Sequence, residues 1–118
     1  MNSIFRILSS EQWDEAKITG LIPRCRADIE QNCVHVNEFA DLNIVCNRFF
    51  EPSENPVALE FAPDTYSREL KWLEPTAEKP WRDGRLSIEN LHSDFVLNVY
   101  SFKPEQTADG IVYRLQGE

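Results

Sequence analysis

Residues 33–49 have the sequence CVHVNEFADLNIVCNRF, in which a short apolar strand is followed by an amphipathic helix. Cys33 to Val36 is an apolar run flanked by polar residues, which is typical of a short strand. Asn37 follows it, at the place where a helix N-cap is expected. The helix is predicted from apolar residues that recur at spacings of three and four, namely Phe39, Leu42, Cys46 and Phe49. One face of this helix is therefore expected to pack on a sheet.

The chain before this stretch predicts a strand and a capped helix. Ser3 to Leu8 is mostly apolar and too short for a helix, so we expect a buried strand. Ser9 with Gln12 has the capping-box pattern of a helix start, and Gly20 is placed to end that helix. Pro23 favours a loop in the residues that follow.

The chain after this stretch is predicted to be mainly β. Leu73 to Arg85 has the composition of a loop, and Ser87 to Leu91 is expected to form one helical turn. Strands are expected at residues 56–61, 70–72, 94–102 and 110–115, the last two pairing as a hairpin. The whole pattern predicts an α+β fold in a single domain of residues 1–118.

Composition argues against several classes of function. The formal net charge of −8 repels nucleic-acid phosphates, so a nucleic-acid partner is not expected. The chain has neither an apolar run that could cross a bilayer nor a secretory signal, which predicts no membrane partner and a cytoplasmic location. Three cysteines without C-x-x-C spacing and two distant histidines predict neither a disulfide framework nor a metal site.

His35 is the main candidate for a functional side chain, because a histidine on an apolar strand can hydrogen-bond a ligand or shuttle a proton. The alternative is a strand histidine that serves only structure, which is the more frequent case. Three carboxylates are expected to be solvated charges, namely Asp28 and Glu30, which precede the His35 strand, and Glu74, which follows Trp72. Trp72 and Trp81 could stack on a planar ring, against core packing for Trp72 and a loop lid for Trp81.

Taken in order, these segments resemble the bacterial domain-of-unknown-function family 952. The resemblance covers about residues 3–97 and rests on Ile4-Phe5-Arg6-Ile7-Leu8, Trp13 with Ala16 and Gly20, Asp28 with Val34-His35-Val36-Asn37, Phe49-Phe50, Val57-Ala58-Leu59-Glu60-Phe61, and Leu70-Lys71-Trp72. Members of that family look like small versions of the ADP-ribosyltransferase fold. The resemblance therefore implies a split, mixed β-sheet with two main helices and a nicotinamide-nucleotide cleft between the two halves.

The resemblance also implies roles for particular residues. The strand that ends in His35, Val36 and Asn37 is similar to the H-x-H-[LF]-[AS]-like strand of tRNA 2′-phosphotransferases, with His35 and Asn37 at the matching polar positions. Where the family has an F-P-H-L-Y-G-like segment, this chain has Lys79-Pro80-Trp81-Arg82-Asp83-Gly84. No late-strand E-x-E is present, which leaves Asp94 and His35 as the two candidate catalytic residues.

The leading hypothesis is a domain that binds NAD, an ADP-ribose-like nucleotide or another small planar ligand. Its expected contacts are Arg6, His35, Asn37, Trp72, Trp81 and Arg82. One alternative is a non-enzymatic interaction or accessory protein, a homodimer in one version, with a residual cleft in which His35 only ties strands together. Another alternative is a divergent transferase or hydrolase that acts on an ADP-ribose-like bond. The sequence leaves open whether the protein is an enzyme.

Overall fold

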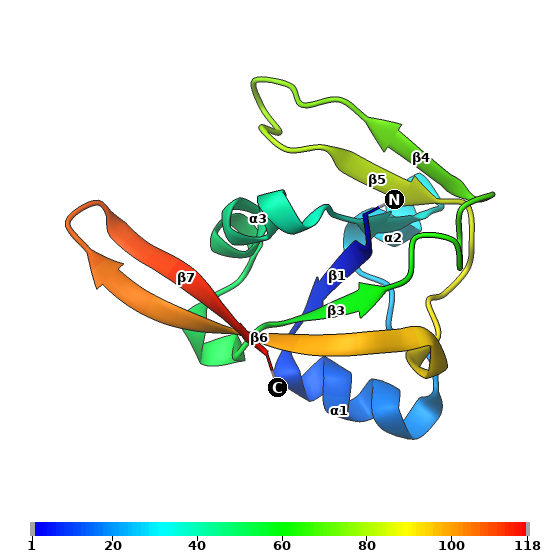
Figure 1. Cartoon of the computed structure of the whole chain (residues 1–118), viewed down its shortest axis with the longest axis horizontal. Coiled ribbons are helices and arrows are strands. Elements are labelled where there is room, and N and C mark those ends of the chain that lie inside the picture. Colours follow the sequence, from blue (N-terminus) through cyan, green and yellow to red (C-terminus); the bar gives the residue numbers. More distant parts are fainter. Residues whose placement is uncertain (1, 118) are drawn as a thin grey trace.

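The computed structural model describes residues 2–117, and it contains two antiparallel sheets that meet at one point (Figure 1). The four-stranded sheet has the order β1-β3-β6-β7, formed by β1 (Ile4–Leu8), β3 (Val57–Phe61), β6 (Val96–Thr107) and β7 (Gly110–Gly117). The three-stranded sheet has the order β2-β5-β4, formed by β2 (Val34–Val36), β5 (Asp83–Leu86) and β4 (Leu70–Leu73). The predicted α+β class is confirmed, although each strand pair is antiparallel rather than mixed.

The two sheets are joined where β1 passes the end of β2. Phe5 and Asn37 form an antiparallel bridge with two backbone hydrogen bonds of 2.9 and 2.8 Å. Beyond this bridge the two strands separate, so the sheet is split between β1 and β2. Side chains must therefore satisfy the backbone of β2 along the split, because unpaired buried N–H and C=O groups are costly.

The helices begin and end largely for local reasons. In α1 (Ser10–Thr19), the N–H of Gln12 donates to Ser9 Oγ, and the N–H of Ser9 donates to Gln12 Oε1, both at 3.1 Å. Gly20 ends this helix with a φ of 84°, a left-handed conformation that glycine adopts without strain. The capping box and the helix end predicted for α1 are thus confirmed. The other helices are α2 (Arg26–Gln31) and α3 (Leu42–Phe49), with single 3₁₀ turns at Phe39–Asp41, Pro52–Glu54 and Ser93–Phe95.

Several local predictions were wrong. α2 forms where a loop was expected after Pro23, β5 lies within the expected loop, and the helical turn falls at Ser93–Phe95 rather than at Ser87 to Leu91. Asn37 caps no helix, since its backbone pairs with Phe5 instead. The buried face of α3 consists of Leu42, Val45 and Cys46, whereas Phe39 and Phe49 are exposed.

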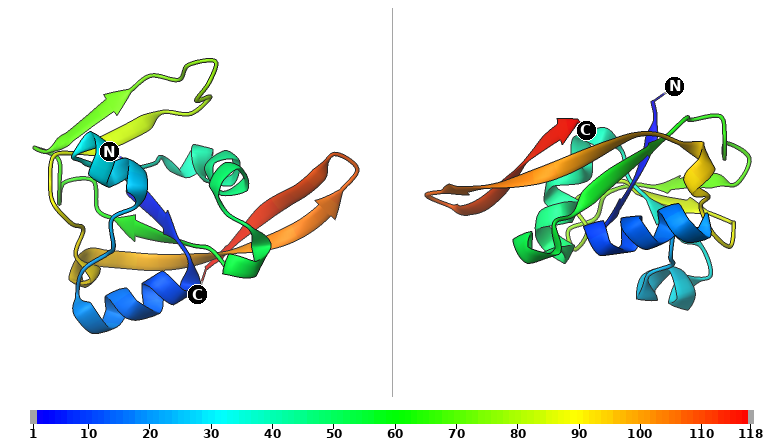
Figure 2. Two further views of the ribbon diagram at one scale, coloured as in Figure 1. Left: turned by 180° about the vertical axis from the view of Figure 1, so that it is seen from behind. Right: turned by 90° about the horizontal axis from the view of Figure 1, so that it is seen from below.

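Two apolar cores lie on opposite faces of the four-stranded sheet, because successive side chains of β1 point to opposite sides. Ile4 and Leu8 belong to the first core, together with Ala16 of α1 and the apolar face of β2. Phe5 and Ile7 belong to the second core, which α3 covers. Figure 2 shows α1 and α3 against the sheet and the β6–β7 hairpin projecting beyond the rest of the chain. None of the helices in residues 2–117 has the length and apolar character that a membrane span requires.

Candidate functional site

Asp28 is the centre of a buried polar cluster at the split between β1 and β2. It lies in the first turn of α2, where its Oδ2 accepts a hydrogen bond of 3.0 Å from the N–H of Cys25. α2 ends at Asn32, whose left-handed φ of 52° turns the chain back into β2. This tight connection brings His35 beside the carboxylate that precedes it by seven residues. The side chain of Asp28 is completely buried.

Arg6 and Asp28 fill the split and satisfy the backbone of His35. Arg6 reaches from β1 and donates to Asp28 Oδ2 at 2.6 Å, to Asp28 Oδ1 at 3.3 Å and to the His35 carbonyl at 2.7 Å. The N–H of His35 donates to Asp28 Oδ1 at 3.0 Å. Alternate residues of a strand direct their N–H and C=O to the same side, so His35 and Asn37 both face β1. The backbone of Asn37 bonds to the backbone of Phe5, whereas the backbone of His35 bonds to the side chains of Arg6 and Asp28.

Asp28 is ionised in spite of its burial. Burial alone would raise the pKa of the carboxyl group, but hydrogen bonds from His35, Arg6 and Cys25 and the charge of Arg6 outweigh it and hold the pKa well below its ordinary value. An ionised carboxylate can only accept hydrogen bonds. The Nδ1 of His35, 2.7 Å from Asp28 Oδ1, must therefore carry a proton.

This contact fixes the orientation of the His35 ring and leaves Nε2 as its outer atom. Nε2 lies 2.9 Å from Oε1 of the exposed Gln31 and 3.9 Å from the Sγ of Cys33. Burial raises the pKa of the Cys33 thiol, so this cysteine has no character of an activated nucleophile. A histidine held at Nδ1 by a buried carboxylate can hydrogen-bond a ligand or exchange a proton through Nε2.

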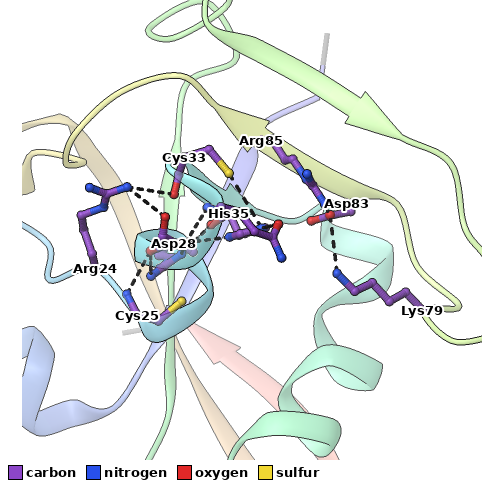
Figure 3. Close-up of polar contacts among 10 residues, drawn as sticks. Arg24, Cys25, Asp28, Cys33, His35, Lys79, Asp83 and Arg85 are labelled. Atoms are coloured by element: carbon purple, nitrogen blue, oxygen red, sulfur yellow. Dashed lines mark hydrogen bonds and ion pairs between the residues drawn. The ribbon is translucent and has the colours of Figure 1, made fainter.

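A row of cationic side chains continues from His35 across the three-stranded sheet. His35 pairs with Arg85 of β5, and Arg85 pairs with Lys71 of β4, so the three side chains lie next to one another on one face. The Arg85 side chain is 32% exposed and Lys71 is exposed. Asp83 accepts from Arg85 Nε at 3.1 Å and lies 4.0 Å from Lys79 Nζ, as Figure 3 shows. Arg85 and Lys79 thus share the carboxylate of Asp83, while Lys71 has no ion-pair partner within residues 2–117, on a protein whose net charge is −8.

One group of residues has the ligand types of a metal site. Ligand atoms of Cys25, Asp28 and His35 lie within 4.8 Å of one another. The two oxygens of Asp28 already accept hydrogen bonds from Arg6, His35 and Cys25, and the Arg6 guanidinium holds a positive charge beside them. A metal ion would have to displace the Nδ1 proton of His35 and compete with Arg6, so these residues do not fit a metal ion.

The structure separates the residues predicted to form one cleft. Arg6 is buried and paired with Asp28, so it does not offer its guanidinium to a ligand anion. Trp81 was expected to contact the ligand, with a loop lid as the alternative, but it is 5% exposed in the second core, where Phe49 packs edge-on against it at 5.7 Å. Both side chains are buried and packed within the chain, so neither presents a free surface to a ligand in this structure. Asn37 uses its backbone to join the sheets.

Trp72 and Arg82 lie on the opposite face of the three-stranded sheet from His35, because Trp72 is adjacent in sequence to Lys71. The Arg82 guanidinium lies 4.8 Å from the centre of the Trp72 ring and forms ion pairs with Glu38 and Glu74. These partners already occupy Arg82. Gly84 lies beneath Trp72, where a Cβ atom would come within 2.7 Å of the ring.

Asp94, the candidate catalytic carboxylate, is exposed on the turn Ser93–Phe95. This turn is tied to the end of α1, since the N–H of Ser93 donates to the Gly20 carbonyl at 3.0 Å and Leu21 bridges to His92. Asp94 therefore does not stand beside His35. Two surface hollows of about 440 and 550 Å³ are present, and neither is lined by His35.

Sequence reasoning missed Asp28, Arg85 and Lys71 as partners of His35. Asp28 was noted but interpreted as a solvated charge, and the segment around Arg85 was interpreted as a loop. The available signal for Asp28 was its place in a resemblance segment together with His35. The signal for Arg85 was weaker, because β5 has only four residues, among them Asp83 and Gly84, which strands usually avoid.

Comparisons with known proteins support the fold alone. No protein-family model and no curated protein matches the chain. Among solved structures, the crystal structure of protein CC0527 from Caulobacter crescentus is similar, with a TM-score of 0.74 and 22% identity over 94% of this chain and 93% of that one. The solution NMR structure of CC0527 gives a TM-score of 0.70 and 24% identity over 94% and 91% of the two chains. At this level of identity the likeness establishes a shared fold and leaves function to the residues.

Proposed function

We propose that the protein binds a small ligand with an anionic group, a nucleotide phosphate being the form expected, on the face of the three-stranded sheet at His35, Arg85 and Lys71. The observation that carries this proposal is the row of these three side chains, in which Asp28 holds the His35 ring. Arginine and lysine supply charge-assisted hydrogen bonds to phosphate oxygens. Because His35 Nδ1 donates to Asp28, Nε2 adds another such bond only when the ring is an imidazolium, with its Nε2–H directed to the ligand instead of to Gln31 Oε1. NAD and ADP-ribose-like nucleotides remain the candidate ligands.

The cleft was first expected near His35, Asn37, Trp72 and Trp81, and the present proposal keeps only His35 of these four contacts. The residual-cleft alternative draws support from Arg6, Arg82 and Trp81, which are all satisfied by partners within the chain. The row at His35 is different in its partners. Within residues 2–117, Lys71 is exposed and has no ion-pair partner, and Arg85 is paired with one carboxylate whereas Arg82 is paired with two. The similarity to the ADP-ribosyltransferase fold and the cytoplasmic location are part of this proposal.

The test is a titration of the full chain with NAD, ADP-ribose, a 2′-phosphorylated nucleotide and pyrophosphate, followed by amide chemical shifts. We expect perturbations at β2, β4 and β5. Arg85→Gln should weaken binding about tenfold, since a charged hydrogen bond contributes roughly 1.5–3 kcal/mol before solvent screening at this partly exposed site. Lys103→Gln on the exposed part of β6 is the matched control for charge. Unperturbed amides around His35 at millimolar ligand, or equal losses in the two variants, would contradict the proposal.

A divergent transferase or hydrolase is a second candidate, favoured by the 2.7 Å contact between His35 Nδ1 and the buried Asp28. This pair can support proton transfer at Nε2. The Asp28 side chain is completely buried and cannot contact a ribose. It therefore cannot serve as the carboxylate that would stabilise an oxocarbenium-like centre. Turnover of NAD or of a 2′-phosphorylated RNA that is lost in His35→Gln would support this candidate, and no turnover in the wild-type protein would count against it.

A further inference from the structure

A hollow of about 440 Å³ lies on the other sheet, at the end of the four-stranded sheet where β1 begins. Its residues are Asn2, Ser3, Phe5, Glu38, Phe39, Ala40, Glu60 and Tyr100, and we call it the aromatic hollow. Phe5 and Glu60 are directly paired on one face of the sheet, and Phe39 comes from the 3₁₀ turn after β2. α3 covers the rest of this face but not this end, since its buried residues pack with Phe102 and Tyr113 farther along.

Three aromatic rings are clustered in the hollow. Phe5 lies 5.5 Å from Phe39 and 6.2 Å from Tyr100, and Phe39 lies 6.5 Å from Tyr100, measured between ring centres. The three planes are inclined to one another by 55 to 73°. Phe39 is 55% exposed, although a ring of this size would be expected in the core. The faces of aromatic rings are electronegative, so such a cluster attracts cations.

Glu60 gives the hollow a fixed negative charge. Its Oε2 accepts from Ser3 Oγ at 2.7 Å, and its Oε1 accepts from Asn98 Nδ2 at 2.9 Å and from Tyr100 Oη at 3.2 Å. The hydrogen bond from Ser3, followed by those from Asn98 and Tyr100, lowers the pKa of Glu60 despite partial burial. Within residues 2–117, Glu60 has no ion-pair partner, whereas Glu38 on the rim is paired with Arg82. The hollow thus combines ring faces with a carboxylate that stays ionised.

We propose that the aromatic hollow binds a small organic ammonium ion, with the rings of Phe39 and Tyr100 against its alkyl groups and Glu60 balancing its charge. The Phe5 ring is only 3% exposed and supports the other two rings by packing against them. This site is separate from the anion site at His35, because it lies on the four-stranded sheet and carries the opposite charge. Cation–π contacts and a carboxylate together favour a quaternary or alkylammonium group over a neutral group of equal shape. The negative charge of Glu60 disfavours a phosphate in this hollow.

The test compares choline with 3,3-dimethylbutan-1-ol, its neutral isostere, on the full chain by amide chemical shifts at constant ionic strength. We expect choline to perturb the amides of Phe5, Phe39 and Tyr100 at millimolar concentration, and the alcohol to bind at least about fivefold more weakly. Equal binding of the two would show an apolar hollow without cation preference. No shift with choline, or shifts elsewhere, would likewise overturn the proposal.

Two variants test whether choline binds in the aromatic hollow itself. Glu60→Gln should weaken choline binding about fivefold while leaving binding of the alcohol unchanged. Phe39→Leu should weaken choline binding through loss of the ring, and its exposed position lets the chain fold, so it decides the question should Glu60→Gln unfold. Arg85→Gln alters only the anion site. It should bind choline as the wild type does, and a loss in this variant would contradict a separate cation site.

Discussion

Two arginines form ion pairs with carboxylates in this molecule, one in the buried interior and the other at the surface. Arg6 lies in the split between the sheets, with a side chain that is 9% exposed, and contacts the fully buried Asp28. Arg82 lies before β5, with a side chain that is 37% exposed, and contacts Glu38 and Glu74. Solvent screens the second set of contacts but not the first. An arginine–carboxylate pair should therefore contribute far more to the free energy of unfolding at the split than at the surface.

The difference follows from what each arginine replaces. Arg6 and Asp28 stand where a neighbouring strand would otherwise pair with His35, so they complete the sheet and position the His35 ring at once. Arg82 covers the Trp72 ring, whose place depends on packing over Gly84. The split around Arg6 and Asp28 is thus stabilised by buried charges, and the region around Trp72 by close packing of the ring over Gly84.

Asp28→Asn should have the largest effect on stability. The amide is nearly isosteric, but it leaves the Arg6 charge buried without a counter-charge, which is expected to lower the free energy of unfolding by about 3–5 kcal/mol. Urea unfolding followed by circular dichroism measures this loss. Glu74→Gln removes a carboxylate from the surface arginine and serves as the matched control, with a loss below about 1 kcal/mol. Equal losses in the two variants would abolish the distinction between the regions.

Acid should weaken the protein through Asp28. The folded-state pKa of this carboxyl lies below its ordinary value of 3.8, so its contribution is complete above that value and is lost as pH falls toward the folded pKa. We expect wild-type stability to fall by on the order of 2–3 kcal/mol more than that of Asp28→Asn between pH 5 and pH 2. Urea midpoints across this range test the expectation, and parallel curves for the two proteins would refute it.

The sequence predicted the elements that are set by local signals. Ser9, Gln12 and Gly20 mark both ends of α1, because capping groups act within a few residues. The alternation after Gly110 predicted the β6–β7 hairpin in the same way, since a hairpin needs only neighbouring strands. The likeness to CC0527 over 94% of the chain supports the α+β fold assembled from these pieces.

The candidate site could not be predicted in full, because its partners meet only through tertiary structure. Asp28 looks like any helix carboxylate until the split sheet places Arg6 and His35 around it. Arg85 becomes a neighbour of His35 only through the pairing of β2 with β5. Trp81 follows Glu78, Lys79 and Pro80, a sequence that is typical of an exposed loop. It is nevertheless buried, because α3 and β7 form a core around it.

Gly84→Ala should destabilise the packing around Trp72 through steric overlap, without any change of charge. A Cβ at this position would lie 2.7 Å from the Trp72 ring and 2.8 Å from Cγ2 of Val36, closer than side chains in a folded protein approach. Displacing the ring is expected to reduce the free energy of unfolding by about 1–3 kcal/mol. Ser87→Ala, just beyond the end of β5, is a suitable control. Thermal unfolding combined with tryptophan fluorescence would show both the loss and the movement of Trp72, and an unchanged fluorescence would argue against close packing there.

Arg82→Gln should have the smallest effect. Its ion pair with Glu74 is exposed to solvent, and its ion pair with Glu38 and its stacking on Trp72 are partly exposed. The expected loss in the free energy of unfolding is therefore below about 1 kcal/mol. That loss should shrink further in 1 M salt, since the screening length falls to about 3 Å. The Asp28→Asn loss should persist at the same salt concentration, because no mobile ion reaches the split. Urea unfolding of both variants at low and high salt makes this comparison, and a salt-insensitive Arg82→Gln effect would mean that Arg82 acts through packing on Trp72 rather than through charge.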